Sequence, residues 1–127
     1  MKILVSNQSE LPIYAQIKEQ IKEQILNGQI LEGTVLPSIR MLAKEIGVSV
    51  ITTTRAYNDL EKEGYISSMQ GKGSIVLSKE NKILKEQYLV RIEQGLFTAV
   101  ETAKRIEMTE AQVHNLISEI WKGMMEE

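Results

Sequence analysis

The chain has 127 residues, a formal net charge of −2 at neutral pH and 43% hydrophobic residues. This composition fits one compact globular domain with a modest appendage. The chain contains no cysteine, which excludes disulfides and thiolate metal sites. No stretch is long and apolar enough for a secretory signal or a membrane span, so we expect a cytoplasmic protein.

The first expected helix starts at Pro12 and ends near residues 27–28. Proline suits the first turn of a helix because its φ is fixed and its missing N–H is not needed there. Isoleucine recurs every four residues along this segment, at Ile13, Ile17, Ile21 and Ile25. We expect the resulting apolar face to pack across the helices that follow. The short apolar run at residues 3–5 either adds a small strand or frays.

Two short helices joined by a tight turn are predicted next. Ser38 follows Pro37 and can cap a helix that runs to about Ile46. Gly47 can end that helix in a left-handed conformation, and Ser49 can cap a second helix by accepting a hydrogen bond from the backbone N–H of residue 52. So short a link makes the helices cross, which predicts a helix-turn-helix.

The second helix has an inward and an outward face. Spacings of three and four place Thr53, Ala56, Tyr57 and Leu60 toward the core. Ser49, Val50, Ile51, Thr52 and Arg55 then point outward near its N-terminal end. In a major groove, hydroxyls can bond phosphates or bases, and a β-branched apolar side chain can contact a thymine methyl. An arginine can bond a guanine edge or a phosphate. The alternative is that the three consecutive threonines, residues 52–54, form an ordinary solvated helix surface.

A β-hairpin is predicted after the helix stops at Gly64. Residues 65–69 and 74–77 have strand character and flank a turn that contains Gly71, Lys72 and Gly73. The two glycines allow the backbone to approach a phosphate or a narrow groove closely, and the lysine supplies the charge. The alternative is a plain hairpin turn in which the lysine serves solubility.

Several of these motifs together resemble the GntR family of bacterial transcription regulators. The matching segments are residues 12–17, 36–43, 47–49, 55–57, 60–61, 63–64 and 71–73, with Gly28, Gly33 and Thr52. Within that family the short chain, the Pro-Ile-Tyr opening and the Arg-Ala-Tyr triplet are similar to the YtrA subfamily. The resemblance implies a winged helix-turn-helix, a dimeric repressor and often an operon that encodes an ABC transporter.

The resemblance also implies which residues contact DNA. These are Arg40, Ser49, Thr52, Arg55 and the wing residues Gly71, Lys72 and Gly73. Many relatives carry a basic or amide side chain where this sequence has Val50 and Ile51, so base readout here is expected to rely more on thymine methyls.

The charges are unevenly distributed along the expected DNA-binding segment. Residues 37–58 hold three basic residues against one acidic residue, and Lys72 adds a further positive charge. The acids Asp59, Glu61 and Glu63 follow toward the far end of the second helix. We therefore expect a local basic face and a modest dependence of binding on salt.

Residues 79–127 are expected to form a separate helical region after a winged domain at residues 1–78. A long helix to about residue 106 carries one apolar stripe: Tyr88, Ile92, Leu96, Ala99, Ala103 and Ile106. Thr109 then caps a last helix, with Gln112 completing a capping box and Met108 packing against Val113. That helix carries a second stripe: Val113, Leu116, Ile117, Ile120, Trp121 and Met124.

One helical hairpin of this size cannot bury both stripes, so we expect a partner, most simply an identical chain. A homodimer would present two recognition helices to the half-sites of an inverted-repeat operator, about one DNA turn apart. The alternative is a monomer in which the hairpin folds back on its own winged domain. The expected fold class is therefore mainly α with a small β-hairpin, a winged helix-turn-helix followed by a dimerisation hairpin.

Other function classes find little support in the sequence. No acid–base pair, phosphate loop or cofactor motif indicates an enzyme, and no cofactor is expected. His114 is the only histidine and lacks a metal-ligating partner at helical spacing. A winged-helix module that binds a protein instead of DNA remains the alternative function. A hydrophobic small-molecule effector that enters near Trp121 and the methionines is a further hypothesis.

Overall fold

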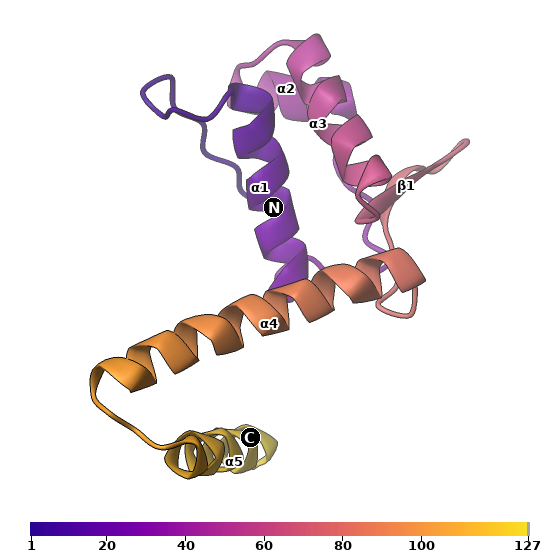
Figure 1. The fold of residues 1–127 in the computed structure, drawn as a ribbon. Helices are drawn as coiled ribbons and strands as arrows, with labels where there is room; N and C mark the ends of the chain where they lie inside the picture. The colour runs from indigo at the N-terminus through magenta and orange to yellow at the C-terminus, as the bar shows by residue number, and fades with distance from the viewer. Residues whose placement is uncertain (127) are drawn as a thin grey trace. The chain divides into compact units, whose positions relative to one another are not determined.

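The computed structural model describes residues 1–126 and confirms the expected mainly helical fold with one hairpin (Figure 1). The elements in chain order are α1 (Ile13–Leu26), α2 (Ile39–Ile46), α3 (Val50–Lys62), β1 (Ile66–Met69), β2 (Gly73–Val76), α4 (Lys82–Arg105) and α5 (Glu110–Met125). The chain divides into two compact units, the first ending at Tyr88 and the second beginning at Leu89.

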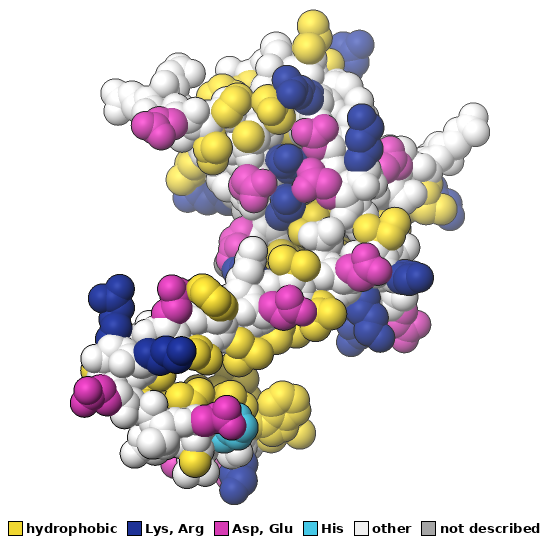
Figure 2. Space-filling view, in the orientation of Figure 1, with side chains coloured by type: hydrophobic (Ala, Val, Ile, Leu, Met, Phe, Trp, Pro, Cys, Tyr) yellow, Lys and Arg dark blue, Asp and Glu magenta, His cyan; other side chains and the backbone are white. Residues whose placement is uncertain are grey.

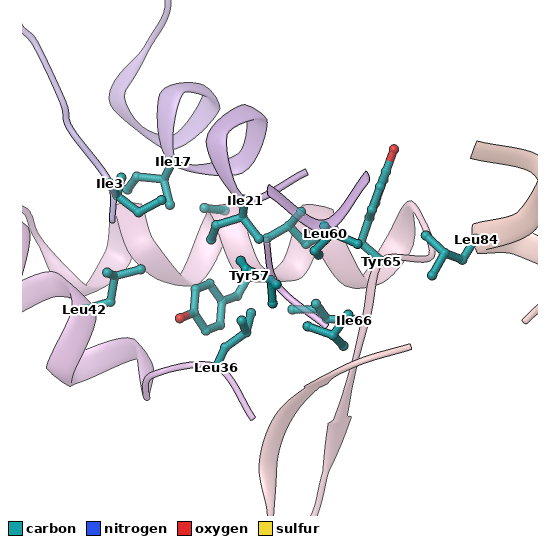
Figure 3. Close-up of a cluster of buried hydrophobic side chains, with 14 residues drawn as sticks. Ile3, Ile17, Ile21, Leu36, Leu42, Tyr57, Leu60, Tyr65, Ile66 and Leu84 are labelled. Atoms are coloured by element: carbon teal, nitrogen blue, oxygen red, sulfur yellow. The ribbon is translucent and has the colours of Figure 1, made fainter. Parts of the chain in front are cut away.

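The core of the first unit forms where α1 packs against α3. Ile17, Ile21 and Ile25 are buried, which confirms the four-residue repeat expected for α1. They meet side chains from α2, α3 and β1, several of which Figure 3 shows converging on one cluster. All four residues expected on the inward face of α3 are buried: Thr53, Ala56, Tyr57 and Leu60. Pro12 occupies the N-cap position of α1, one residue before the expected first turn.

The helix-turn-helix is capped as the sequence predicts. The Ser38 hydroxyl accepts a hydrogen bond from the Met41 N–H at 3.1 Å, and Ser49 accepts one from the Thr52 N–H at 3.0 Å. Gly47 ends α2 with a left-handed φ of 69°. The buried Tyr57 hydroxyl donates to the Pro37 carbonyl at 2.6 Å, which ties α3 to the start of α2. These bonds fix the angle at which α3 leaves the turn.

The N-terminal segment is neither a strand nor frayed, contrary to both alternatives considered above. Three glutamines of α1 bond its extended backbone. Gln16 pairs with both backbone groups of residue 6, Gln20 with both backbone groups of residue 4, and Gln24 with the carbonyl of residue 2. Four residues of a helix rise about 6 Å, which is close to the length of two extended residues. Every fourth residue of α1 therefore meets every second residue of the N-terminal segment. This pairing buries Ile3 against the core.

The hairpin has the expected turn, although each strand is shifted slightly. β1 pairs antiparallel with β2, with Met69 opposite Gly73, so Gly73 belongs to the strand and not to the loop. A third extended segment, residues 33–36, lies along β2. The Leu36 N–H donates to the Ser74 carbonyl at 2.8 Å, and the Val76 N–H donates to the Thr34 carbonyl at 2.9 Å. No periodic pattern in the sequence indicates this short pairing.

The first unit, which holds the helix-turn-helix and the hairpin, is called the winged unit. It includes the first turns of α4 and so extends ten residues past the expected boundary at residue 78. Leu84 is almost fully buried in its core, and the Tyr88 hydroxyl donates to the Ile25 carbonyl at 3.2 Å. Gly64 lies directly against Ile83 of α4. The polar composition of residues 78–82 indicates a loop, but the winged unit continues past this loop into α4.

The second unit comprises the remainder of α4 and α5. Thr109 and Gln112 form the expected capping box, and Met108 and Val113 are both half-buried, as a hydrophobic staple requires. α4 ends at Arg105, so Ile106 lies just outside the helix and is exposed. Within residues 89–126 only Ala103 is buried. Hydrophobic side chains line the facing sides of the two helices (Figure 2). No helix in residues 1–126 could cross a lipid bilayer.

Candidate nucleic-acid interface

The leading edge of α3, residues 49–55, lies on the surface of the winged unit. Ser49, Val50, Ile51 and Arg55 are exposed, and Thr52 is half-buried. Ile51 is 82% exposed, the largest value among the large hydrophobic side chains. Its side chain is therefore open to any group that approaches this edge of α3. This exposure is what a contact with an external apolar group, such as a thymine methyl, requires.

The hydroxyls at the start of α3 have different capacities for further bonding. Ser49 accepts from the Thr52 N–H and donates its proton to the Thr52 hydroxyl at 2.8 Å. This bond uses one of the two hydroxyl protons, so the Ser49–Thr52 pair keeps one proton for an outside acceptor. Thr54 uses its proton on the Val50 carbonyl at 2.7 Å. The Ser49–Thr52 pair therefore offers one hydroxyl donor, which a phosphate can accept.

Arg55 is held against the ring of Tyr14 from α1. The guanidinium carbon is 3.7 Å from the ring centroid, which is a close cation–π stack. Sequence reasoning treated Tyr14 only as part of a family motif and missed this contact. Tyr14 and Arg55 are 41 residues apart, and no local pattern predicts that they meet.

Positive and negative charges separate along α3, as the sequence predicts. At the far end, the Lys18 amine lies 3.1 Å from Glu63 and 3.7 Å from Asp59, and Lys22 lies 2.8 Å from Glu63. Figure 2 shows Lys and Arg side chains mixed with Asp and Glu side chains on one face of the winged unit. On α2, which packs against α3, Arg40 and Lys44 are exposed. Within residues 1–126 neither makes an ion pair, so their charge remains available to a polyanion.

The ion pairs shift the ionisation of the groups that form them. Burial disfavours the charged form of Glu63, but hydrogen bonds and charge attraction from Lys22 and Lys18 outweigh it, so its pKa is lowered from 4.5. Burial likewise opposes the charge of Lys22, yet Glu63 and Glu19 keep its pKa above 10.5. Both groups are thus charged at neutral pH and neutralise one another, away from the leading edge of α3.

The wing places Lys72 at the tip of the hairpin. Gly71 and Gly73 have φ of 79° and 81°, a region that glycine adopts without strain. Lys72 is exposed. The carboxylate of Glu61 accepts from the Ser68 N–H at 2.6 Å, which fastens β1 to α3 and fixes where the wing begins. The wing and α3 therefore belong to the same packed unit.

The residues expected to form a dimer interface divide between the two units. Tyr88 belongs to the winged unit and packs on its core, and its part in a dimer interface stays a prediction. The other residues lie in the second unit, and all except the half-buried Val113 are exposed: Ile92, Leu96, Val113, Leu116, Ile117, Ile120, Trp121 and Met124. α5 itself has no buried residue.

A groove of about 380 Å³ lies between α4 and α5 in the second unit. Its walls are mostly apolar, with Leu96, Val100, Val113 and Ile117 among them, and the exposed His114 lies at its edge. Within residues 1–126, no three His, Cys, Asp or Glu side chains gather as a metal site would require.

Comparisons with known proteins agree with this geometry. The family model described as "Bacterial regulatory proteins, gntR family" matches residues 13–76, which run from α1 to the end of β2. The chain is 33% identical over 118 residues to the HTH-type transcriptional repressor YtrA of Bacillus subtilis (strain 168). That alignment covers 93% of this chain and 91% of YtrA.

Two solved structures extend the likeness to three dimensions. YtrA from Sulfolobus acidocaldarius, a GntR-family transcription factor, matches with a TM-score of 0.58 and 38% identity, over 74% of this chain and 96% of that one. The DNA-binding domain of AraR in complex with operator ORX1 matches with a TM-score of 0.53 and 35% identity, over 60% and 95%. The chain therefore belongs to the GntR family of bacterial regulatory proteins, within its YtrA subfamily, and is a transcription regulator rather than an enzyme.

Proposed function

We propose that this chain is a sequence-specific DNA-binding repressor that reads an inverted-repeat operator as a homodimer. The observation that carries this proposal is the open leading edge of α3, where an apolar side chain, a hydroxyl donor and a stacked arginine lie together. The likeness to the AraR domain that was solved with an operator supports the same use of the winged unit.

Each residue of this face has a role that its chemistry suits. Ile51 and Val50 meet thymine methyls, and Arg55 donates to a guanine edge. Arg40 and the Ser49–Thr52 hydroxyl pair bond phosphates, and Ser49 also caps the start of the helix. In the wing, Lys72 lies between Gly71 and Gly73 and contacts the DNA backbone along an adjacent groove. Phosphate contacts set affinity, and the base contacts set specificity.

Dimerisation is the role we propose for the second unit. Its apolar side chains are mostly exposed in a single chain, and water would oppose so large an open apolar surface. A two-fold partner buries the same patch on both chains and places two α3 helices on successive turns of the duplex.

The regulated genes are proposed from the family resemblance, and the signal is proposed from the apolar character of the second unit. An operon for an ABC transporter is our candidate target. A hydrophobic effector that enters the groove between α4 and α5 is our candidate signal, because the walls of this groove are apolar. A panel of lipophilic compounds that leaves operator affinity unchanged would remove the effector from the scheme.

The test of the DNA-binding face uses a duplex that the full chain selects from a random pool, with binding followed by fluorescence anisotropy. Arg55→Ala and Arg40→Ala should each weaken binding by about 1–3 kcal/mol, and only Arg55→Ala should also relax the preferred sequence. Lys72→Ala should weaken binding evenly across sequences and reduce its salt dependence. Lys62→Ala, at the far end of α3, is the matched control and should bind normally.

Two results would contradict the proposal. Selection that enriches no sequence would favour a module that binds a protein partner instead. Arginine variants that bind as tightly as the unaltered chain would show that another face of the winged unit carries the contact. Circular dichroism of each variant confirms that a loss of binding is not a loss of fold.

A further inference from the structure

We infer that Tyr14 of α1 is a positioning residue for DNA recognition, acting through Arg55. This inference rests on the proposed function, since it needs Arg55 to contact DNA. The guanidinium carbon lies 3.7 Å above the centre of the Tyr14 ring. The ring is half-buried and packs against the hydrophobic core of the winged unit, so it is a fixed platform and not a mobile surface group.

The stack restricts Arg55 without using its hydrogen-bonding capacity. A guanidinium stacks through its flat face, whereas its five N–H groups lie in the plane and point outward from the edge. Within residues 1–126, Arg55 makes no ion pair that would draw those donors away. Arg55 is thus held flat against the protein with its donor edge open, the form in which it can bond two acceptors of one guanine.

Holding the arginine before binding favours the complex for an entropic reason. A free arginine side chain samples many rotamers and loses them when it docks on a base. The Tyr14 ring removes part of that freedom when the protein folds, so less is lost on DNA. α1, expected from the sequence only to support the helix-turn-helix, thereby takes part in recognition.

Two other roles for Tyr14 must be separated from this one. Its ring could serve the core alone, or its hydroxyl could bond a phosphate directly. Tyr14→Phe keeps the aromatic face and removes the hydroxyl, whereas Tyr14→Leu keeps apolar bulk and removes the face. Combining Tyr14→Leu with Arg55→Ala shows whether the tyrosine acts through the arginine.

The experiment measures dissociation constants of the full-length variants for the selected duplex and for a shuffled duplex. We expect Tyr14→Leu to weaken specific binding about three- to tenfold, the size of one cation–π contact, and Tyr14→Phe to stay within about twofold. In the Arg55→Ala background, Tyr14→Leu should cause no further loss. A repeated selection with Tyr14→Leu should lose preference at the base pair where Arg55→Ala loses it.

Several outcomes would overturn the inference, and they differ from failure of the proposed function. If Tyr14→Phe is as weak as Tyr14→Leu, the hydroxyl matters and the stack does not. If Tyr14→Leu is equally harmful in the Arg55→Ala background, the tyrosine acts by itself or through folding. Normal binding by Tyr14→Leu, with Arg55→Ala impaired, refutes only the positioning role. Normal binding by Arg55→Ala refutes the assigned α3 face, and the positioning role with it.

Discussion

The winged unit and the second unit, which is entirely helical and is called the helical unit below, bury their apolar residues to very different extents. In residues 1–88 the core includes side chains from α1, α2, α3, β1, β2 and the first turn of α4, most of them almost inaccessible to water (Figure 3). In residues 89–126 only Ala103 is buried, and Trp121 is 69% exposed. Both units have helices with good caps and apolar stripes. Helical periodicity therefore does not tell whether a stripe is covered by the same chain.

The two units therefore obtain their stability in different ways. The winged unit closes a core within one chain, so its free energy of unfolding should not depend on protein concentration. The helical unit leaves its stripes open, so its stability should depend on whatever covers them.

The sharpest test makes the same substitution in both units. Ile21→Ala empties a fully buried site in the winged unit and should lower its free energy of unfolding by about 2–5 kcal/mol. Ile120→Ala removes the same atoms from a side chain that is 57% exposed, and should leave the winged unit unaffected. Urea unfolding followed by circular dichroism measures both. Equal losses from the two variants would contradict the contrast between the units.

A second pair of variants compares two glycines. A Cβ at Gly64 would lie 2.0 Å from the Ile83 side chain, and φ there is 88°. Gly64→Ala should therefore destabilise the winged unit by about 3 kcal/mol. Gly95 lies within α4 with open space around it, so Gly95→Ala should instead stabilise that helix by about 0.5–1 kcal/mol. Thermal unfolding should shift in opposite directions, and a shared direction would refute the packing at Gly64.

A third prediction concerns the partner of the helical unit. If a second copy covers the stripes, Trp121→Ala should weaken dimerisation by at least about 2 kcal/mol, because large aromatic residues dominate such interfaces. Sedimentation equilibrium measures the dimer constant directly. Lys122→Ala changes the neighbouring exposed residue and should leave the constant unaltered. A chain that sediments at 14.4 kDa before any substitution would show that no second copy is bound.

The smallest effect is expected from the ion pairs between α1 and α3. Because the pKa of Glu63 is lowered in the folded chain, its charge stabilises the fold above its ordinary value of 4.5. That stabilisation is lost as the pH falls below 4.5 and through the lowered pKa. At neutral pH, Glu63→Gln should cost less than about 1 kcal/mol, since the pair is partly exposed to solvent. Urea titrations across this acidic range should show the two proteins converging.

The local signals in the sequence predicted the helices and turns well, because each depends on residues a few positions apart. Ser38 and Ser49 were expected as N-caps, and Thr109 with Gln112 as a capping box, and all three motifs are present. The buried face of α3 followed from helical spacing alone. These elements already defined the helix-turn-helix and where its recognition edge should begin.

Other features required the tertiary structure because they join distant residues that have no shared periodicity. The pairing of α1 glutamines with residues 2–6, the contact of residues 33–36 with β2 and the packing of Ile83 on Gly64 are of this kind. The domain boundary moved for the same reason, since Leu84 and Tyr88 reach a core formed by much earlier residues.

The candidate site combines both kinds of information. The sequence by itself determined which residues stand on the leading edge of α3, because capping and helical spacing are local and follow from side-chain chemistry. The support of that edge depends on contacts between residues distant in sequence. Arg55 stacks on Tyr14, and the acidic end of α3 pairs with Lys18 and Lys22. Such contacts form where α1 crosses α3, and the crossing is fixed by the shape of the whole buried core.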